Sequence, residues 1–299
     1  MPPETSGVGI DTILDEMTDI SIYLSLDTGH TVFPMDAELI SIIIPSLNEE
    51  RHIGMALQSI KEQDYTNFEV ILVDSFSKDR TKEIATGLGA KVIDYPGRLL
   101  GARVEGLKAS KGGWIMHIDA DQVMRPGALS RCVEQMHRHD MVVLGERSYK
   151  PSNWVQRELD RQRLFFETEA INGGEGYNVY PRLFKRHLLE HAYSQIPESM
   201  IPTMGSYEDS LVYSKVREKS TDSVIVPEVV WHNEESNALE LYRHQRSIGR
   251  RTRAYRDQMK IDSFHRSKPK TRGMLDALKH RYLTVSMIKE MGFQVGYRL

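Results

Sequence analysis

The chain has 299 residues, of which 40% are hydrophobic and 27% are charged, and its formal net charge is -3. This composition is typical of a folded globular protein, and the small negative charge gives no indication of nucleic-acid binding, so no nucleic-acid partner is expected. The single cysteine, Cys132, excludes an intramolecular disulfide and a multi-cysteine metal site and fits a reducing, cytoplasmic location. The N-terminus carries acidic residues without an apolar core, and apolar runs are short, so neither a secretory signal nor a membrane-spanning helix is expected.

Residues 1–37 are expected to form an accessory segment. Ile20, Ile22, Leu24 and Leu26 alternate with other residues, and an Asp-Thr-Gly turn sequence follows at residues 27–29. This alternation is typical of a β-hairpin.

Residues 38–235 are expected to form one α/β domain. Apolar runs typical of buried strands occur at residues 40–44, 68–73, 91–93, 114–118 and 141–144. Patterns typical of helices separate them at residues 52–62, 79–86, 100–109 and 127–136. Strands that alternate with helices predict a mostly parallel sheet flanked by helices on both faces.

The second half of the chain is predicted to be richer in helices. Helical patterns occur at residues 154–169, 208–218, 238–259 and 274–291. The last two predict a helical C-terminal extension over residues 236–299. The glycine-rich sequence at residues 173–176 lacks the lysine and flanking strand of a phosphate-binding loop, so a flexible loop on the acceptor side is expected there.

Three polar clusters follow three different predicted strands. They are residues 45–49 (Pro-Ser-Leu-Asn-Glu), Asp74 with Ser75, and Asp119-Ala120-Asp121. In open α/β sheets ligands bind outside the carboxyl ends of the strands, so these clusters are predicted to meet at one edge of the sheet.

Asp119 and Asp121 are the candidate metal-binding pair. Two carboxylates two residues apart, just after a buried strand, suit a hard divalent cation that also takes water and phosphate oxygens as ligands. A solvated turn or a helix N-cap is the alternative, because aspartate is common in both.

Four motifs in a fixed order resemble those of the inverting family 2 glycosyltransferases of the GT-A fold. They are residues 45–50, residues 73–81 (Val-Asp-Ser-Phe-Ser-Lys-Asp-Arg-Thr), residues 101–103 (Gly-Ala-Arg) and residues 118–121 (Ile-Asp-Ala-Asp). The first two also resemble the retaining glucosyl-3-phosphoglycerate synthases. The resemblance implies a GT-A type α/β fold and a glycosyltransferase that uses manganese or magnesium to move a sugar from a nucleoside-diphosphate sugar to an unidentified hydroxyl or phosphate acceptor. Inversion is the expected outcome, with a retaining enzyme or a non-catalytic nucleotide-binding scaffold as alternatives.

The same resemblance assigns residues to the donor. Asp74 and Ser75 would contact the base, Asp119 would lie near the ribose and metal, and Asp121 would be a metal ligand. Arg103 would reach the diphosphate, with a surface helix arginine as the alternative. The residues that would wrap the base and ribose are Pro45, Ser46, Leu47, Asn48 and Glu49. Two positions depart from many relatives: Ser75 replaces an aspartate, and Val104 replaces an asparagine.

The resemblance also implies roles for two later residues. Asp209, in the sequence Glu208-Asp209 that opens a predicted helix, would be the general base that deprotonates the acceptor; capping of the helix is the alternative. His232 follows an apolar run and would join the carboxylates as a metal ligand, or else be a hydrogen-bonded structural residue.

The C-terminal extension is basic and amphipathic. Lysine and arginine interleave with apolar residues over residues 274–299, as in helices that lie on anionic membranes. A peripheral contact with the cytoplasmic face of a membrane is therefore expected, and a lipid-linked acceptor would favour it; the alternative is a helix whose apolar face packs on the domain.

Overall fold

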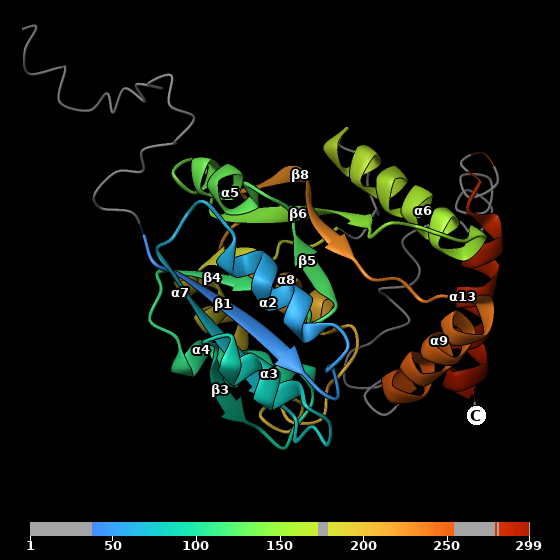
Figure 1. Ribbon diagram of the computed structural model, residues 1–299, viewed down its shortest axis with the longest axis horizontal. Helices are drawn as coiled ribbons and strands as arrows, with labels where there is room; N and C mark the ends of the chain where they lie inside the picture. Colours follow the sequence, from blue (N-terminus) through green and yellow to red (C-terminus); the bar gives the residue numbers. More distant parts are fainter. Residues whose placement is uncertain (1–37, 173–178, 254–278, 280, 299) are drawn as a thin grey trace, which may run out of the picture. The chain divides into compact units, whose positions relative to one another are not determined.

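The computed structural model describes residues 38–172, 179–253, 279 and 281–298 (Figure 1). The hairpin expected within residues 1–37, the glycine-rich loop at 173–176 and the stretch 254–278 lie outside the described residues.

The described residues build one mixed sheet with helices on both of its faces. The strand order is β3-β2-β1-β4-β7-β6-β8-β5. The strands are β1 (Ile40–Ser46), β2 (Phe68–Asp74), β3 (Lys91–Asp94), β4 (Trp114–His117), β5 (Gln122–Met124), β6 (Met141–Ser148), β7 (Leu183–Lys185) and β8 (Ser223–His232). The helices are α2 (Ile53–Lys61), α3 (Thr81–Gly87), α4 (Leu99–Ala109), α5 (Ala128–Met136), α6 (Trp154–Ile171), α7 (Arg186–Ser194), α8 (Glu208–Val216), α9 (Ala238–Arg253) and α13 (Leu283–Arg298).

The N-terminal half of the sheet is parallel, as its sequence predicts. β1 pairs in parallel with β2 and with β4, and β2 pairs in parallel with β3. The register places Ser46 beside Asp74, and the amide of Ile118 donates to the carbonyl of Ile43. The three predicted polar clusters therefore do meet at the carboxyl edge of this half.

The second half of the sheet is less regular than the sequence suggests. β5 and β7 have three residues each and run antiparallel to β8 and to β4 and β6, respectively. Segments this short carry no periodic hydrophobic pattern, so the sequence did not predict β5 and β7. It did not predict the nine-residue helix α7 either. The α/β class and the mostly parallel pairing of the sheet are nevertheless confirmed.

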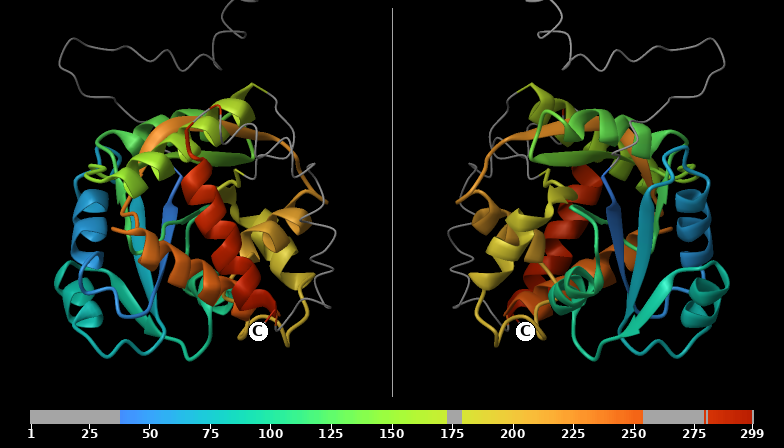
Figure 2. Two further views of the ribbon diagram at one scale, coloured as in Figure 1. Left: turned by 90° about the vertical axis from the view of Figure 1, so that its right-hand side faces the viewer. Right: turned by 90° about the vertical axis from the view of Figure 1, so that its left-hand side faces the viewer.

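The helices form a layer on each side of the sheet. α4, α7 and α8 bury their apolar residues with Ile43, Ile71 and Ile115 in one cluster. α2 and α3 lie on the opposite side of the sheet (Figure 2).

The two C-terminal helices pack closely along each other. α9 and α13 lie side by side in all three views (Figures 1 and 2). Glycines allow this approach, since a Cβ atom on Gly296 would lie 1.9 Å from the carbonyl oxygen of Arg246, and one on Gly249 would lie 2.2 Å from that of Phe293. Val285 of α13 is buried in a cluster with residues of α6 and α9. No helix among the described residues is both long and apolar enough to cross a membrane.

A glycine substitution tests the junction between β1 and β4. A Cβ atom on Gly112 would lie 2.4 Å from the carbonyl oxygen of Leu39, whereas one on the neighbouring Gly113 would meet the tip of the Glu38 side chain at 3.0 Å. Crowded backbone cannot move as a side chain can, so Gly112→Ala should lower the free energy of unfolding by about 1–3 kcal/mol. The matched variant Gly113→Ala should stay within about 0.5 kcal/mol of the wild type in urea denaturation. Equal effects of the two variants would contradict this packing.

Candidate functional site

The loops after β1 and β2 are tied together by the Asp74 carboxylate. Asp74 is fully buried, and its Oδ2 accepts the amide of Ser77 at 2.7 Å. Its Oδ1 accepts the hydroxyls of Ser46, at 3.0 Å, and of Ser77. The predicted base-binding carboxylate is thus already occupied in holding both loops.

Backbone contacts fix the rest of these loops. Asn48 adopts a left-handed conformation with φ of 57°, and its amide donates to Ser77 Oγ at 2.8 Å. Its side-chain Oδ1 accepts the amide of Lys78, also at 2.8 Å, and the Glu49 amide donates to Thr81 Oγ1. Because asparagine tolerates this conformation well, the Leu-Asn-Glu sequence can make the sharp turn.

A large cleft opens beside these loops. Its volume is about 1070 Å³, near the upper end of the range of about 300–1,000 Å³ that is usual for ligand sites. The predicted donor residues among its lining are Pro45, Ser46, Leu47, Glu49 and Ser75. Further walls come from residues 96–99, from the segment that precedes α8 (Pro202, Thr203, Gly205, Ser206 and Tyr207, followed by Glu208) and from α9 (His244, Gln245, Ile248 and Arg251).

Strand pairing brings His232 to the Asp119-Asp121 turn. β5 starts directly after this turn and pairs antiparallel with β8, with Gln122 opposite His232. Asn233 donates through both its backbone and side-chain nitrogens to the carbonyl oxygen of Asp121. His232 Nε2 then lies 3.8 Å from Asp121 Oδ2.

These residues fit a divalent cation that is shared with a ligand. Burial raises the pKa of Asp121, and a bound cation would offset that cost of desolvation. Among the described residues no group of three or more histidine, cysteine, aspartate or glutamate side chains is placed to hold a metal. Asp121 and His232 would supply two ligands to a divalent ion, which would need water or phosphate oxygens for the rest of its shell.

Arg103 is the central cation of the site. Only 1% of Arg103 is exposed, so the alternative of a surface arginine is wrong. Its guanidinium lies 3.2 Å from Asp119 and from Glu208 and also pairs with Asp209. Burial would lower the pKa of Arg103, but these three carboxylates raise it. The guanidinium is thus committed to carboxylates rather than free for the diphosphate contact that the sequence predicts.

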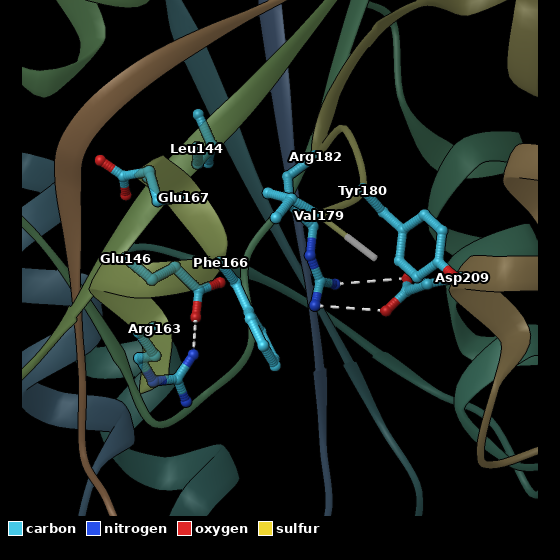
Figure 3. A pocket seen from close by; sticks show the side chains of 10 residues that line it. Leu144, Glu146, Arg163, Phe166, Glu167, Val179, Tyr180, Arg182 and Asp209 are labelled. Carbon is cyan, nitrogen blue, oxygen red and sulfur yellow. Dashed lines mark hydrogen bonds and ion pairs between the residues drawn. The ribbon is translucent and has the colours of Figure 1, made fainter. Parts of the chain in front are cut away.

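A second arginine, which the sequence analysis missed, joins the same carboxylates. Arg182 Nη2 lies 3.3 Å from Asp119 and from Asp209, and Figure 3 shows its guanidinium facing Asp209. Arg182 directly precedes the three-residue strand β7, so nothing in its sequence context separates it from other surface-type arginines. Burial would raise the pKa of Asp209, but Arg103 and Arg182 together hold it well below its usual range.

Glu208 and Asp209 are neighbours whose pKa values are shifted in opposite directions. Burial and the adjacent Asp209 raise the pKa of Glu208 to about 7, and Arg103 offsets them only in part. Near neutral pH the carboxyl of Asp209 is therefore ionised, whereas that of Glu208 titrates.

A smaller pocket has Asp209 in its lining, whereas Glu208 lines the large cleft. The volume of the smaller pocket is about 260 Å³. Figure 3 shows the side chains that line it. Its lining includes Asp209, Arg182, Tyr180, Phe166 and Arg163. Arg163 pairs with Glu146, which also lines the pocket, and with Glu234. Asp209 thus lines a pocket other than the large cleft.

Comparisons with known proteins identify the same family over half of the chain. The sequence model of glycosyl transferase family 2 matches residues 41–192. An uncharacterized glycosyltransferase, EpsJ of Bacillus subtilis, is 28% identical over 171 residues, which are 52% of this chain and 50% of that protein. The Escherichia coli WfgD, a UDP-Glc:alpha-D-GlcNAc-diphosphoundecaprenol beta-1,3-glucosyltransferase, is 30% identical over 112 residues, 36% of this chain and 44% of that protein. The match thus spans half or less of these relatives.

A solved structure shares the fold. The S. aureus TarS fragment 1-349 in complex with UDP-GlcNAc superposes with a TM-score of 0.53 at 19% identity, covering 82% of this chain and 79% of that fragment.

The raised pKa of Glu208 predicts a pH-dependent stability. Between its ordinary pKa of 4.5 and about 7 the folded protein keeps a proton that the unfolded chain releases, so this residue makes stability fall as pH rises through that window. Glu208→Gln cannot titrate and should gain stability relative to wild type between about pH 5 and about pH 8 in chemical denaturation. A difference between the two proteins that does not change with pH would contradict the shift.

Proposed function

Since the chain belongs to glycosyl transferase family 2, we propose that it transfers a sugar from a nucleoside-diphosphate sugar to an acceptor hydroxyl. The observation that carries the proposal is the meeting of three features at one edge of the sheet. They are the cleft beside residues 45–49, the Asp119-Asp121 turn with His232, and Asp209 facing a second pocket.

A UDP-sugar is the proposed donor. The E. coli relative is named for UDP-glucose, and residues 45–49 and Ser75 line a cleft large enough for a nucleotide. In this arrangement Leu47 and the backbone of its loop would hold the base and ribose, and Asp74 would keep the two loops in place without touching the donor.

Asp121 and His232 are the proposed metal ligands, with Asp119 beside them. A bound manganese or magnesium ion would neutralise the leaving diphosphate as a Lewis acid. Arg103 and Arg182 both pair with Asp119 and so fix the orientation of its carboxylate within the Asp119-Asp121 turn.

Asp209 is the proposed general base, and inversion is the proposed outcome. The two arginines keep its carboxylate ionised and aimed at the smaller pocket, where the acceptor would bind. They also lower its affinity for a proton, so proton transfer requires at least one of these ion pairs to lengthen in the substrate complex. Product configuration, read by NMR, distinguishes inversion from retention.

A lipid-linked molecule is the proposed acceptor substrate. The E. coli relative is named for an acceptor joined to diphosphoundecaprenol. The C-terminal extension packs inward through Val285 and exposes Leu239, Met287 and Met291. These exposed apolar residues support a peripheral membrane contact, which stays a prediction.

Replacing Asp209 tests the function directly. Asp209→Asn keeps the size of the side chain but cannot accept the proton, so turnover should fall by roughly 10²- to 10⁴-fold. Donor affinity, measured by calorimetry, should be nearly unchanged. The control Asp222→Asn removes a carboxylate that pairs with His139 outside both pockets and should keep full activity. Normal turnover in Asp209→Asn would refute the assignment, and a parallel loss of donor affinity would make Asp209 a binding residue.

The incomplete ligand set predicts that metal and nucleotide bind together. Manganese should bind weakly to the protein alone and at least about ten-fold more tightly with UDP present, since phosphate oxygens complete its shell. Asp121→Ala should abolish this coupling, and His232→Ala should weaken it less. Titration of Mn²⁺ by electron paramagnetic resonance measures both. Coupling that survives in Asp121→Ala would remove this residue from the metal site.

A further inference from the structure

One helix beyond the segment that defines the family lines the nucleotide cleft. The family match ends at residue 192, whereas α9 begins at Ala238. Its cleft-lining residues are His244, Gln245, Ile248 and Arg251. Their spacing of one, three and three residues places them on one face of the helix, so α9 presents a continuous wall to the cleft.

The position of this wall is fixed by α13. Glycines 249, 292 and 296 allow the backbones of α9 and α13 to approach closely, and such close contact leaves little freedom to slide. Phe293 of α13 also meets Tyr207 with ring centroids 5.9 Å apart, and Tyr207 lines the cleft. The two helices are therefore joined to the catalytic domain at the cleft itself.

Two arginines line the cleft, one directly before α4 and one on α9. Arg98 lies at its lip on the α4 side, is exposed, and forms no ion pair with any other described residue. Its aliphatic stem lies against the Cα of Gly205, where a Cβ atom would come within 3.2 Å of Arg98 Cδ. Arg251 and His244 line the cleft from α9.

The carboxylates of the cleft lining are already paired. Glu49 accepts a hydrogen bond from His52, and Glu208 pairs with Arg103. Neither His52 nor Arg103 lines the cleft, so these partners do not add to the positive charge that a ligand meets there. Arg98 thus faces a ligand with little competing negative charge from the cleft lining.

We propose that α9 forms one wall of the donor site and that Arg98 and Arg251, which both line the cleft, bind the diphosphate of the donor nucleotide. Guanidinium groups match phosphate oxygens in charge and in their paired hydrogen-bonding geometry. This assignment rests on the proposed function, because it takes the cleft beside residues 45–49 as the nucleotide site. It gives the basic α9 helix a role in donor binding that needs no membrane.

Calorimetry with UDP and with uridine, at fixed magnesium concentration, tests the assignment. Arg98→Ala and Arg251→Ala should each weaken UDP binding by about ten-fold or more, as the loss of a charge-assisted hydrogen bond predicts. Binding of uridine, which lacks phosphate, should be unchanged. Arg250→Ala is the matched control, since Arg250 is the exposed neighbour of Arg251 on the same helix and does not line the cleft.

The outcomes separate this inference from the proposed function. UDP binding that is equal in wild type and both variants overturns the diphosphate assignment and leaves the function standing. Equal weakening for UDP and uridine also overturns it, because the arginines would then not act on phosphate. Failure of the wild-type protein to bind UDP overturns the proposed donor and this inference together. Arg251→Gln, which keeps most of the side-chain length, replaces Arg251→Ala if that variant unfolds, and the exposed Arg98 provides an independent arm.

Discussion

The guanidinium of Arg103 lies at the point where α4, the turn after β4 and the start of α8 converge. It carries one positive charge among Asp119, Glu208 and Asp209, and it is almost completely buried. Three carboxylates could not remain this close in a desolvated place without a cation, because their mutual repulsion and the cost of burial would exceed what packing supplies. The positions of the candidate metal turn and of the candidate base therefore depend on this side chain together with Arg182, which also pairs with Asp119 and Asp209.

The same cluster divides the roles of two adjacent carboxylates. Glu208 is buried behind Arg103 and its pKa is raised to about 7, whereas Asp209 faces Arg182 and the smaller pocket and stays ionised. Different surroundings thus give two neighbouring acids different charge states at one pH. Only the outward-facing one is placed to meet a second substrate, which agrees with the proposed base.

The C-terminal helices connect this chemistry to a part of the chain that family resemblance does not cover. α9 faces the large cleft, and α13 holds α9 through close backbone contacts at glycines. The basic residues of α9 therefore divide between a face toward the cleft, with Arg251, and an exposed face, with Arg243, Arg250 and Arg253. Basic residues that are close together in the sequence therefore lie in two different environments in the folded protein.

The sequence by itself determined the parallel half of the sheet and the loops at its carboxyl edge. Five-residue apolar runs such as residues 40–44, and polar clusters such as Asp119 and Asp121 directly after a strand, are local signals that tertiary structure did not override. The close approach of His232 to Asp121 was foreseen only from family resemblance, and the pairing of β5 with β8 supplies its physical cause. Which of these residues act in catalysis remains a prediction.

Tertiary structure alone decided which charges meet. Arg103 and Arg182 are 79 residues apart in the chain, yet both pair with Asp119 and Asp209, and no pattern within either segment encodes that contact. Asp74 lies at the strand end where the sequence predicted a base-binding residue, but its buried carboxylate accepts hydrogen bonds from Ser46 and Ser77. Likewise, the apolar spacing of residues 274–291 predicted an amphipathic helix, but only the glycine contacts of α13 with α9 decided which partner the buried face of that helix meets. Local patterns report how a segment folds, whereas desolvation and charge pairing depend on neighbours that are distant in the chain.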